Sequence, residues 1–213
     1  MSQTTDRSGF EFTNEWFGAD RRREWKMLFS QIDATRLLEI GSYEGASACF
    51  LIEHLASRHP VELHCIDTWQ GGIEHREIGT DMSGVEGRFD RNIALAQERA
   101  AHPVRFFKHK GPSLPWLAKL IAAGLSNRFD FIYVDGSHQA PDVLADAVMG
   151  FELLRVGGVM VFDDYLWREM LPEGGDLLRC PKPAVDAFVN LNLRRCLVLQ
   201  APLYQLFIRK LAE

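Results

Sequence analysis

The sequence predicts an α/β protein built on a doubly wound, seven-stranded sheet that is mostly parallel and has one antiparallel strand. From residue 36 onward, short apolar runs alternate with segments of helical periodicity, which is the pattern of β-α-β units in a parallel sheet. After the fifth such run, a helix and two closely spaced β patterns predict a C-terminal β-hairpin with one reversed strand. The length of 213 residues suits a single domain of this class.

The elements can be placed in order along the chain. Parallel strands are expected at the apolar runs 36–40, 61–66, 104–109, 130–135 and 158–163. Helices are expected between them, where apolar residues recur on one stripe, at 45–57, 87–100, 115–123 and 141–154. Pro115 and Pro141 suit the first turn of a helix, which tolerates a missing N–H. A helix at 183–192 then leads to the hairpin strands RCLVLQ (195–200) and YQLFIRKL (204–211).

The N-terminal region has a different character. Residues 10–33 have the pattern of an amphipathic helix and have no partner strand, so packing against the sheet is the simpler expectation and a lid is the alternative. We therefore expect an N-terminal helical extension or lid at 1–35 and the main domain at 36–213. The basic run Arg21 to Arg23 is interleaved with acidic residues, which favours a solvated helix face over a phosphate contact.

Composition limits the partners and the compartment. A hydrophobic fraction of 46% without an unbroken apolar stretch of membrane-spanning length predicts no membrane partner, and a net charge of −5 argues against a nucleic-acid binder. The N-terminus lacks the basic-then-apolar order of a secretory signal, which makes the cytoplasm the expected location. The four cysteines lack metal-site spacing and are expected to be reduced thiols in the core.

A glycine-bracketed turn, LLEIGSYEGAS at 37–47, follows the first strand and opens the next helix. This geometry presents backbone N–H groups and a positive helix end to a ligand. The spacing of Gly41 and Gly45 fits neither the three-glycine dinucleotide fingerprint nor the lysine-bearing phosphate loop, and Glu39 and Glu44 would repel a pyrophosphate. Carboxylates favour a cationic cofactor instead, and S-adenosylmethionine carries both a sulfonium and an ammonium.

The second strand ends in Asp67, about 20 residues beyond the turn, where β-α-β nucleotide folds place an acid that binds the ribose hydroxyls. Asp67 could equally cap the following turn. Trp69 could stack on an adenine or pack in the core, and the sequence does not separate these two roles.

Acidic residues and a histidine follow the fourth and fifth strands. Asp135 ends the fourth, His138 comes three residues later, and Asp163 and Asp164 end the fifth. Ligands bind at the carboxyl ends of such strands, and these two strands are expected neighbours, so the side chains should converge. Each aspartate alone could cap a turn, but together they favour a cation such as Mg²⁺, which takes oxygen ligands. The near-neutral reference pKa of histidine suits His138 as a general base.

Five motifs, LLEIGSYEGAS, CIDTW, HKGPS, FIYVDGSH and GGVMVFDDY, resemble in order and spacing the class I S-adenosylmethionine-dependent O-methyltransferases, whose sheet is Rossmann-like. The likeness is to the metal-dependent small-molecule group, which includes catechol O-methyltransferase and the macrocin-type sugar O-methyltransferases. It covers residues 36–165 well and the terminal hairpin loosely, and it leaves the first 30 residues uncovered.

The resemblance implies roles for individual residues. Implied cofactor contacts are Glu39 and Gly41 at the methionine end, Tyr43 and Ser47 beside its amino acid moiety, Asp67 at the ribose and Ser113 at the adenine, with Gly45, Thr68, Trp69 and Asp135 completing the set. Implied metal ligands are Asp135, Asp163 and Asp164, and the Asp-Asp pair is that of the sugar-modifying branch. His138, with Asp135, would be catalytic.

The sequence therefore predicts an O-methyltransferase that uses S-adenosylmethionine, Mg²⁺ or another divalent metal, and a histidine base. The acceptor would be a hydroxylated small molecule: a sugar, a natural product or a catechol-like diol. The stretches 70–89 and 166–182 flank the site and could form its walls or be ordinary surface loops. A homodimer is one assembly that this class admits. The alternatives are an inactive or accessory protein that binds the cofactor, and an NAD-dependent oxidoreductase, which should show three glycines.

Overall fold

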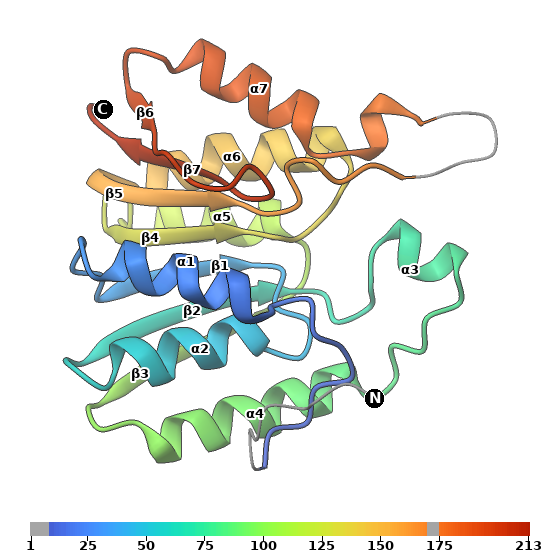
Figure 1. Cartoon of the computed structure of the whole chain (residues 1–213), viewed down its shortest axis with the longest axis vertical. Coiled ribbons are helices and arrows are strands. Elements are labelled where there is room, and N and C mark those ends of the chain that lie inside the picture. Colours follow the sequence, from blue (N-terminus) through green and yellow to red (C-terminus); the bar gives the residue numbers. More distant parts are fainter. Residues whose placement is uncertain (1–8, 170–174) are drawn as a thin grey trace.

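The computed structural model describes residues 9–169 and 175–213. Its centre is one seven-stranded sheet in the order β3-β2-β1-β4-β5-β7-β6 (Figure 1). The strands are β1 (Arg36–Ile40), β2 (Val61–Asp67), β3 (Val104–Lys110), β4 (Phe129–Val134), β5 (Leu154–Phe162), β6 (Cys196–Val198) and β7 (Leu206–Lys210). The strands β1 to β5 pair in parallel, whereas β7 runs antiparallel to both β5 and β6. The predicted fold class is confirmed, including the single reversed strand of the hairpin.

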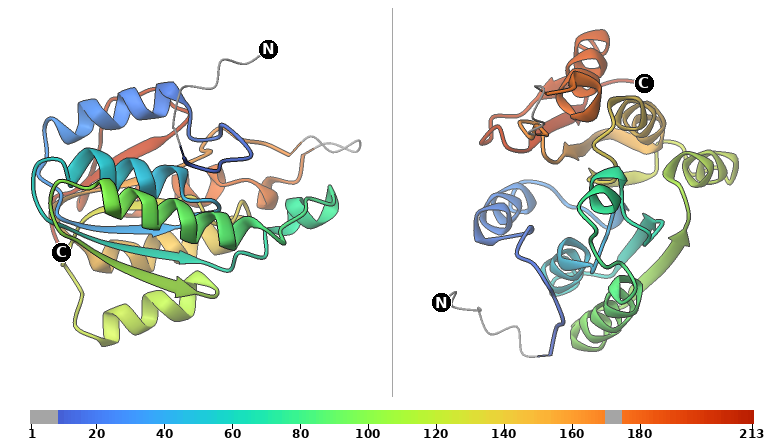
Figure 2. Two further views of the ribbon diagram at one scale, coloured as in Figure 1. Left: turned by 90° about the horizontal axis from the view of Figure 1, so that it is seen from below. Right: turned by 90° about the vertical axis from the view of Figure 1, so that its right-hand side faces the viewer.

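Helices cover both faces of the sheet, so the structure has three layers (Figure 2). The helices are α1 (Ala19–Phe29), α2 (Ala46–Leu55), α3 (Ile73–Glu77), α4 (Val85–Arg99), α5 (Ser113–Ala122), α6 (Ala140–Leu153) and α7 (Lys182–Leu191), with a short 3₁₀ turn η1 (Leu177–Arg179). Helices α1, α2 and α4 enclose one apolar core against the sheet, and α5, α6 and α7 enclose the other. All four cysteines lie within the described residues as buried thiols, as predicted.

Several elements differ from the expectation: only Ala19–Phe29 of the stretch 10–33 is helical, β5 begins four residues earlier than expected, and α3 and α5 differ as follows. Helix α3 lies in the stretch 70–89, where no helix was expected, because one and a half turns are too short to show a helical apolar period. Helix α5 begins at Ser113, so Pro115 is its third residue, still within the first turn that tolerates proline. No helix in the described part of the chain is long and apolar enough to cross a membrane.

The register of the central strands aligns their carboxyl ends. Ile40 pairs with Val134, and Val134 pairs with Phe162. The residues that follow these three therefore stand side by side, and the main chain continues the pairing: the Asp135 N–H donates to the Ile40 carbonyl at 2.8 Å, and the Asp163 N–H to Val134 at 3.0 Å. Strand order reverses on either side of β1, which is the place where open α/β sheets bind ligands.

Helix α1 is fixed to the sheet by Trp25, which is fully buried. Its indole contacts Tyr133 edge-on with ring centroids 4.7 Å apart, and its Nε1 donates to the Gln205 side chain at 2.9 Å. The helix begins near the carboxyl ends of the strands (Figure 1), so its first turn lies at the ligand-binding edge. The N-terminal helix is thus part of the core and also reaches the site.

Replacing Trp25 by alanine should lower the free energy of unfolding by about 3 to 5 kcal/mol, because a large aromatic side chain would leave a cavity between α1 and the sheet. Chemical denaturation followed by far-UV circular dichroism measures this change. Met27→Ala on the same helix is the matched control, since Met27 is 60% exposed and its loss should cost within about 0.5 kcal/mol. Equal effects of the two substitutions would contradict the anchoring role of Trp25.

Candidate active site

The turn after β1 depends on Gly41, which has a φ of +84°. A Cβ at this position would lie 2.0 Å from the carbonyl oxygen of Asp135, so any side chain would push the two loops apart. The Gly41 N–H also donates to Ile66 at the end of β2. Glycine is therefore required because three strand ends meet here in direct main-chain contact.

The carboxylates of Asp67 and Glu39 hold this turn in place by accepting hydrogen bonds from it. Asp67 accepts the N–H groups of Ser42 at 2.7 Å and Tyr43 at 2.8 Å, and its other oxygen accepts the N–H of Trp69. The buried Glu39 accepts the hydroxyls of Ser42 and Ser47, and burial raises its pKa to about 7 despite these hydrogen bonds. Asp67 lines the cavity described below, whereas Glu39 stabilises the turn from within the core.

Two residues near the turn have partners within the protein. The Glu44 carboxylate pairs with Arg88 and accepts hydrogen bonds from the backbone and hydroxyl of Thr13, so Arg88 balances the charge that was expected to favour a cationic cofactor. Trp69 is 4% exposed and packs on Phe89 with centroids 4.8 Å apart, which is the packing alternative of the two roles left open by the sequence.

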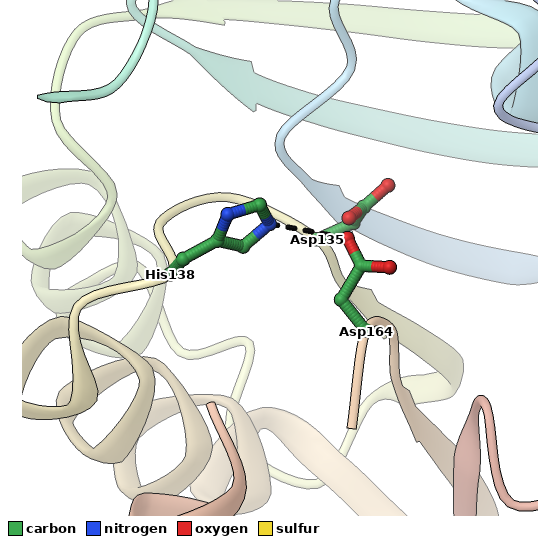
Figure 3. Close-up of side chains that lie close together, drawn as sticks. All are labelled: Asp135, His138 and Asp164. Atoms are coloured by element: carbon green, nitrogen blue, oxygen red, sulfur yellow. Dashed lines mark hydrogen bonds and ion pairs between the residues drawn. The ribbon is translucent and has the colours of Figure 1, made fainter. Parts of the chain in front are cut away.

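The side chains after β4 and β5 converge as the sequence predicted. Asp135, His138 and Asp164 each offer one ligand atom within 4.8 Å of the others (Figure 3). His138 Nε2 lies 3.1 Å from Asp164, its Nδ1 lies 3.5 Å from Glu74 on α3, and its ring packs on Trp167. The sequence did not identify Glu74 and Trp167 as site residues, because both lie in the flanking stretches 70–89 and 166–182, which contain no specific motif.

Asp163 has a different environment from the one expected. The predicted metal ligands were Asp135, Asp163 and Asp164, but the convergent set contains His138 in place of Asp163. The Asp163 oxygens are taken by the hydroxyl of Tyr133, the backbone N–H of Asp164 and the guanidinium of Arg21. The Tyr133 hydroxyl also lies 2.9 Å from Asp135, and it serves one carboxylate at a time because it has a single proton.

The prediction of a solvated basic helix face is wrong for Arg21, whose side chain reaches the acidic cluster. Its Nη2 lies 3.1 Å from Asp163 and 3.5 Å from Asp164, its Nη1 donates to the Trp16 carbonyl, and its guanidinium stacks on the Tyr204 ring. Burial alone would lower the pKa of Arg21, but Asp163, Tyr133 and Asp164 together outweigh this effect and raise it, so the charge is held firmly. The prediction holds for Arg23, whose side chain is exposed and forms only a weak surface ion pair with Asp20 on the same helix.

Burial and mutual repulsion set the protonation of the convergent groups. Burial raises the pKa of Asp135 well above its usual range, and Asp163 and Asp164 raise it further. For Asp164, burial would raise the pKa, but the hydrogen bond and charge of His138, together with Tyr204 and Arg21, outweigh burial and lower it. Burial would lower the pKa of His138, but Asp164 raises it above the ordinary value. The histidine and Asp164 thus favour an ion pair, while Asp135 favours its neutral form.

A cavity of about 1080 Å³ joins the glycine turn to this acidic cluster. Of the predicted site residues, Gly41, Tyr43, Ser47, Asp67, Thr68, Ser113, Asp135, His138, Asp163 and Asp164 line it, whereas Glu39, Gly45 and Trp69 do not. Both flanking stretches contribute walls, through residues 71–78 and 167–169; residues 170–174 of the second stretch lie outside the described residues. The N-terminal segment, for which the sequence left a lid as the alternative to packing, supplies a third wall that includes Trp16 and Arg21.

The strand order, the glycine turn and the acidic strand ends together define the methyltransferase form of a doubly wound sheet, and comparison with known proteins agrees. Residues 38–165 match the sequence profile of a family described as a methyltransferase domain. The chain belongs to this family, and its predicted resemblance to class I S-adenosylmethionine-dependent O-methyltransferases is confirmed.

Particular relatives include caffeoyl-CoA O-methyltransferase 1 of Eucalyptus globulus, 30% identical over 149 residues that cover 70% of this chain and 52% of the relative. Tricin synthase 1 of Oryza sativa subsp. japonica is 30% identical over 151 residues, with the same two coverages of 70% and 52%. The chain spans about half the length of these curated relatives.

Solved structures share the fold. The O-methyltransferase TomG of Streptomyces achromogenes, in complex with S-adenosylmethionine, has a TM-score of 0.64 and 22% identity, over 96% of this chain and 85% of that chain. An O-methyltransferase of Bacillus cereus in complex with S-adenosylhomocysteine has a TM-score of 0.58 and 20% identity, over 89% and 80%.

The raised pKa of Glu39 predicts a pH-dependent stability. Because the folded pKa of about 7 exceeds the ordinary value of 4.5, Glu39 stabilises the protein most below pH 4.5, and its contribution is lost as the pH rises to 7. As the pH rises from 4 to 8, the free energy of unfolding of Glu39→Gln should therefore increase by about 3 kcal/mol relative to that of the wild type. Urea denaturation at several pH values measures the difference.

Glu98→Gln is the matched control, because Glu98 is exposed on α4 and its replacement should leave the pH dependence unchanged. A constant difference between Glu39→Gln and the wild type across this pH range would show that Glu39 is not forced toward its protonated form by burial.

Proposed function

We propose that this protein is an S-adenosylmethionine-dependent O-methyltransferase that methylates a hydroxyl group of a small molecule. The observation that carries the proposal is one cavity that is lined both by the glycine turn and by the cluster of Asp135, His138 and Asp164. A volume of about 1080 Å³ has room for a cofactor and a small acceptor together. The names of the relatives, caffeoyl-CoA O-methyltransferase and tricin synthase, support the reaction class.

The cofactor would lie along the turn after β1. The α2 helix begins directly after Gly45 and offers its positive end to the carboxylate of the methionine moiety. Asp67 and Ser113 line the far part of this region and would contact the ribose and the adenine, respectively. Asp135 lies where the two ends of the cavity meet, so its carboxyl would face the sulfonium, and a nearby cation would favour its ionised form.

A divalent metal ion, Mg²⁺ or another, fits the donors that the chain offers. Asp135 and Asp164 supply the carboxylate oxygens that hard cations prefer, and the repulsion that raises the pKa of Asp135 marks a site short of positive charge. We propose these two residues, with Asp163, as its ligands. When bound, the ion would supply Lewis acidity that increases the acidity of the acceptor hydroxyl.

His138 would act as the general base in its neutral form, which a cation bound at Asp164 would favour by neutralising the carboxylate that raises the pKa of His138. It would take the acceptor hydroxyl proton, the freed oxygen would attack the methyl carbon, and the carbon–sulfur bond would break to leave S-adenosylhomocysteine. Asp164 and Glu74 contact the two ring nitrogens of His138 and fix the orientation of the imidazole. The remaining contribution of the chain is to hold donor and acceptor in line, which supplies several kcal/mol of the barrier reduction.

The walls on the acceptor side favour a flat, hydroxylated acceptor. Trp16 packs on Tyr43 and His75, and Trp167 packs on His138, so aromatic rings stand on two sides of the acidic cluster. Aromatic faces stack readily on a planar ring, which makes a catechol-like diol the first acceptor to test. A sugar hydroxyl is the second, because the Asp-Asp pair belongs to the sugar-modifying branch in the sequence resemblance.

Methyl transfer from labelled S-adenosylmethionine to a panel of catechols and sugars tests the proposal, with and without Mg²⁺. His138→Ala should lower the rate by about 100-fold or more, since a general base contributes at least that factor, and added imidazole should restore part of it. The mutant should still bind S-adenosylhomocysteine in calorimetric titration. His102→Ala is the control, because His102 lies outside the cavity and its replacement should leave the rate unchanged.

The same titrations separate the alternatives. Binding of S-adenosylhomocysteine without transfer to any acceptor would favour an accessory protein that only binds the cofactor. Tight binding of NAD with no binding of S-adenosylhomocysteine would favour an oxidoreductase and overturn the proposal.

A further inference from the structure

We propose that Arg21 is a built-in competitor of the divalent ion: its guanidinium occupies Asp163 and Asp164 until the ion displaces it. This inference rests on the metal site of the proposed function and assigns to the N-terminal helix a control over that site. The motifs of the sequence resemblance do not include Arg21, and it lies before residues 38–165, which match the family profile.

The first argument is charge balance. The Asp163 side chain is 5% exposed and that of Asp164 is 18% exposed, so two neighbouring carboxylates lie largely out of water. Buried charges of one sign are costly unless a partner neutralises them. Arg21 provides that partner at 3.1 and 3.5 Å, which is the electrostatic role that a bound divalent ion would also fill.

The second argument is the occupancy of oxygen atoms. Asp163 Oδ1 already accepts hydrogen bonds from Nε and Nη2 of Arg21 and from the Asp164 N–H, while its Oδ2 is held by Tyr133. A carboxylate oxygen has two lone pairs, so Oδ1 has no room for a metal ion while Arg21 stays. Asp163 can therefore bind a metal ion through Oδ1 only after the guanidinium has left.

The third argument is that Arg21 can move without its helix. Trp25 fixes α1 in the core, whereas the Arg21 side chain reaches the site through a long, flexible stem from the first turn of that helix. Glu24 lies one helical turn further on and already interacts electrostatically with Arg21. It offers the displaced guanidinium a new partner, since residues three apart on a helix are neighbours.

Direct measurement of Mn²⁺ binding, by the electron paramagnetic resonance signal of the free ion, tests the inference without relying on activity. Arg21→Gln should bind Mn²⁺ about tenfold more tightly than the wild type, because removal of the competing charge frees Asp163. Arg21→Lys, which keeps the charge, should stay near the wild type. Arg23→Gln is the matched control, since Arg23 is exposed on the same helix and pairs with Asp20 away from the site.

The melting temperature provides a second, independent measurement. Without metal, Arg21→Gln should have a lower melting temperature than the wild type, and Mn²⁺ should raise it by more than it raises that of the wild type. Adding Asp163→Asn to Arg21→Gln should abolish the gain in Mn²⁺ affinity. Calorimetry with S-adenosylhomocysteine on each variant verifies that the cofactor end of the cavity remains folded.

The outcomes are distinct. If the wild type binds Mn²⁺ and Arg21→Gln binds it equally or more weakly, Arg21 does not compete, and the proposed function stands without this inference. If neither protein binds Mn²⁺, the metal site fails and the inference fails with it. Binding of S-adenosylhomocysteine and methyl transfer in the same samples would then show that the rest of the proposed function survives.

Discussion

Negative charge gathered at the ends of β4 and β5 must be balanced, and much of this end of the molecule is arranged to meet that requirement. Helix α1 delivers Arg21 to Asp163, and the loop after β4 delivers His138 to Asp164. Arg21 reaches its partner only because the buried Trp25 seats α1 on the sheet. The apolar core and the charged site are therefore not independent, since the same helix serves both.

The sheet and the location of the site could be predicted because both follow from local patterns and a general property of parallel strands. Gly41, Asp135 and Asp163 each follow an apolar run, and parallel strands in register bring such positions to one edge. The glycine turn was informative for the same reason, since strand, turn and helix are contiguous in the chain. Each of these features needs only neighbouring residues to be recognised.

The remaining features depend on pairs that are distant in the chain, and no local pattern reveals them. Arg21 and Asp163 are separated by 142 positions, so three consecutive arginines look alike in the sequence although one of them reaches the site. The partner of Glu44 was hidden for the same reason, because Arg88 on α4 is 44 positions away in the chain. The contacts of Arg21 and Tyr133 that occupy the oxygens of Asp163 were equally hidden.

The close approach of Gly41 to the carbonyl of Asp135 has a wider consequence. It fixes the offset between the donor half and the acceptor half of the cavity through the main chain, with no side chain involved. The walls on the acceptor half come from separate segments, at residues 71–78, at 167–169 and ahead of α1. Under the proposed function, changes in those segments would alter which acceptor fits, while the main-chain contact would keep the reacting atoms aligned.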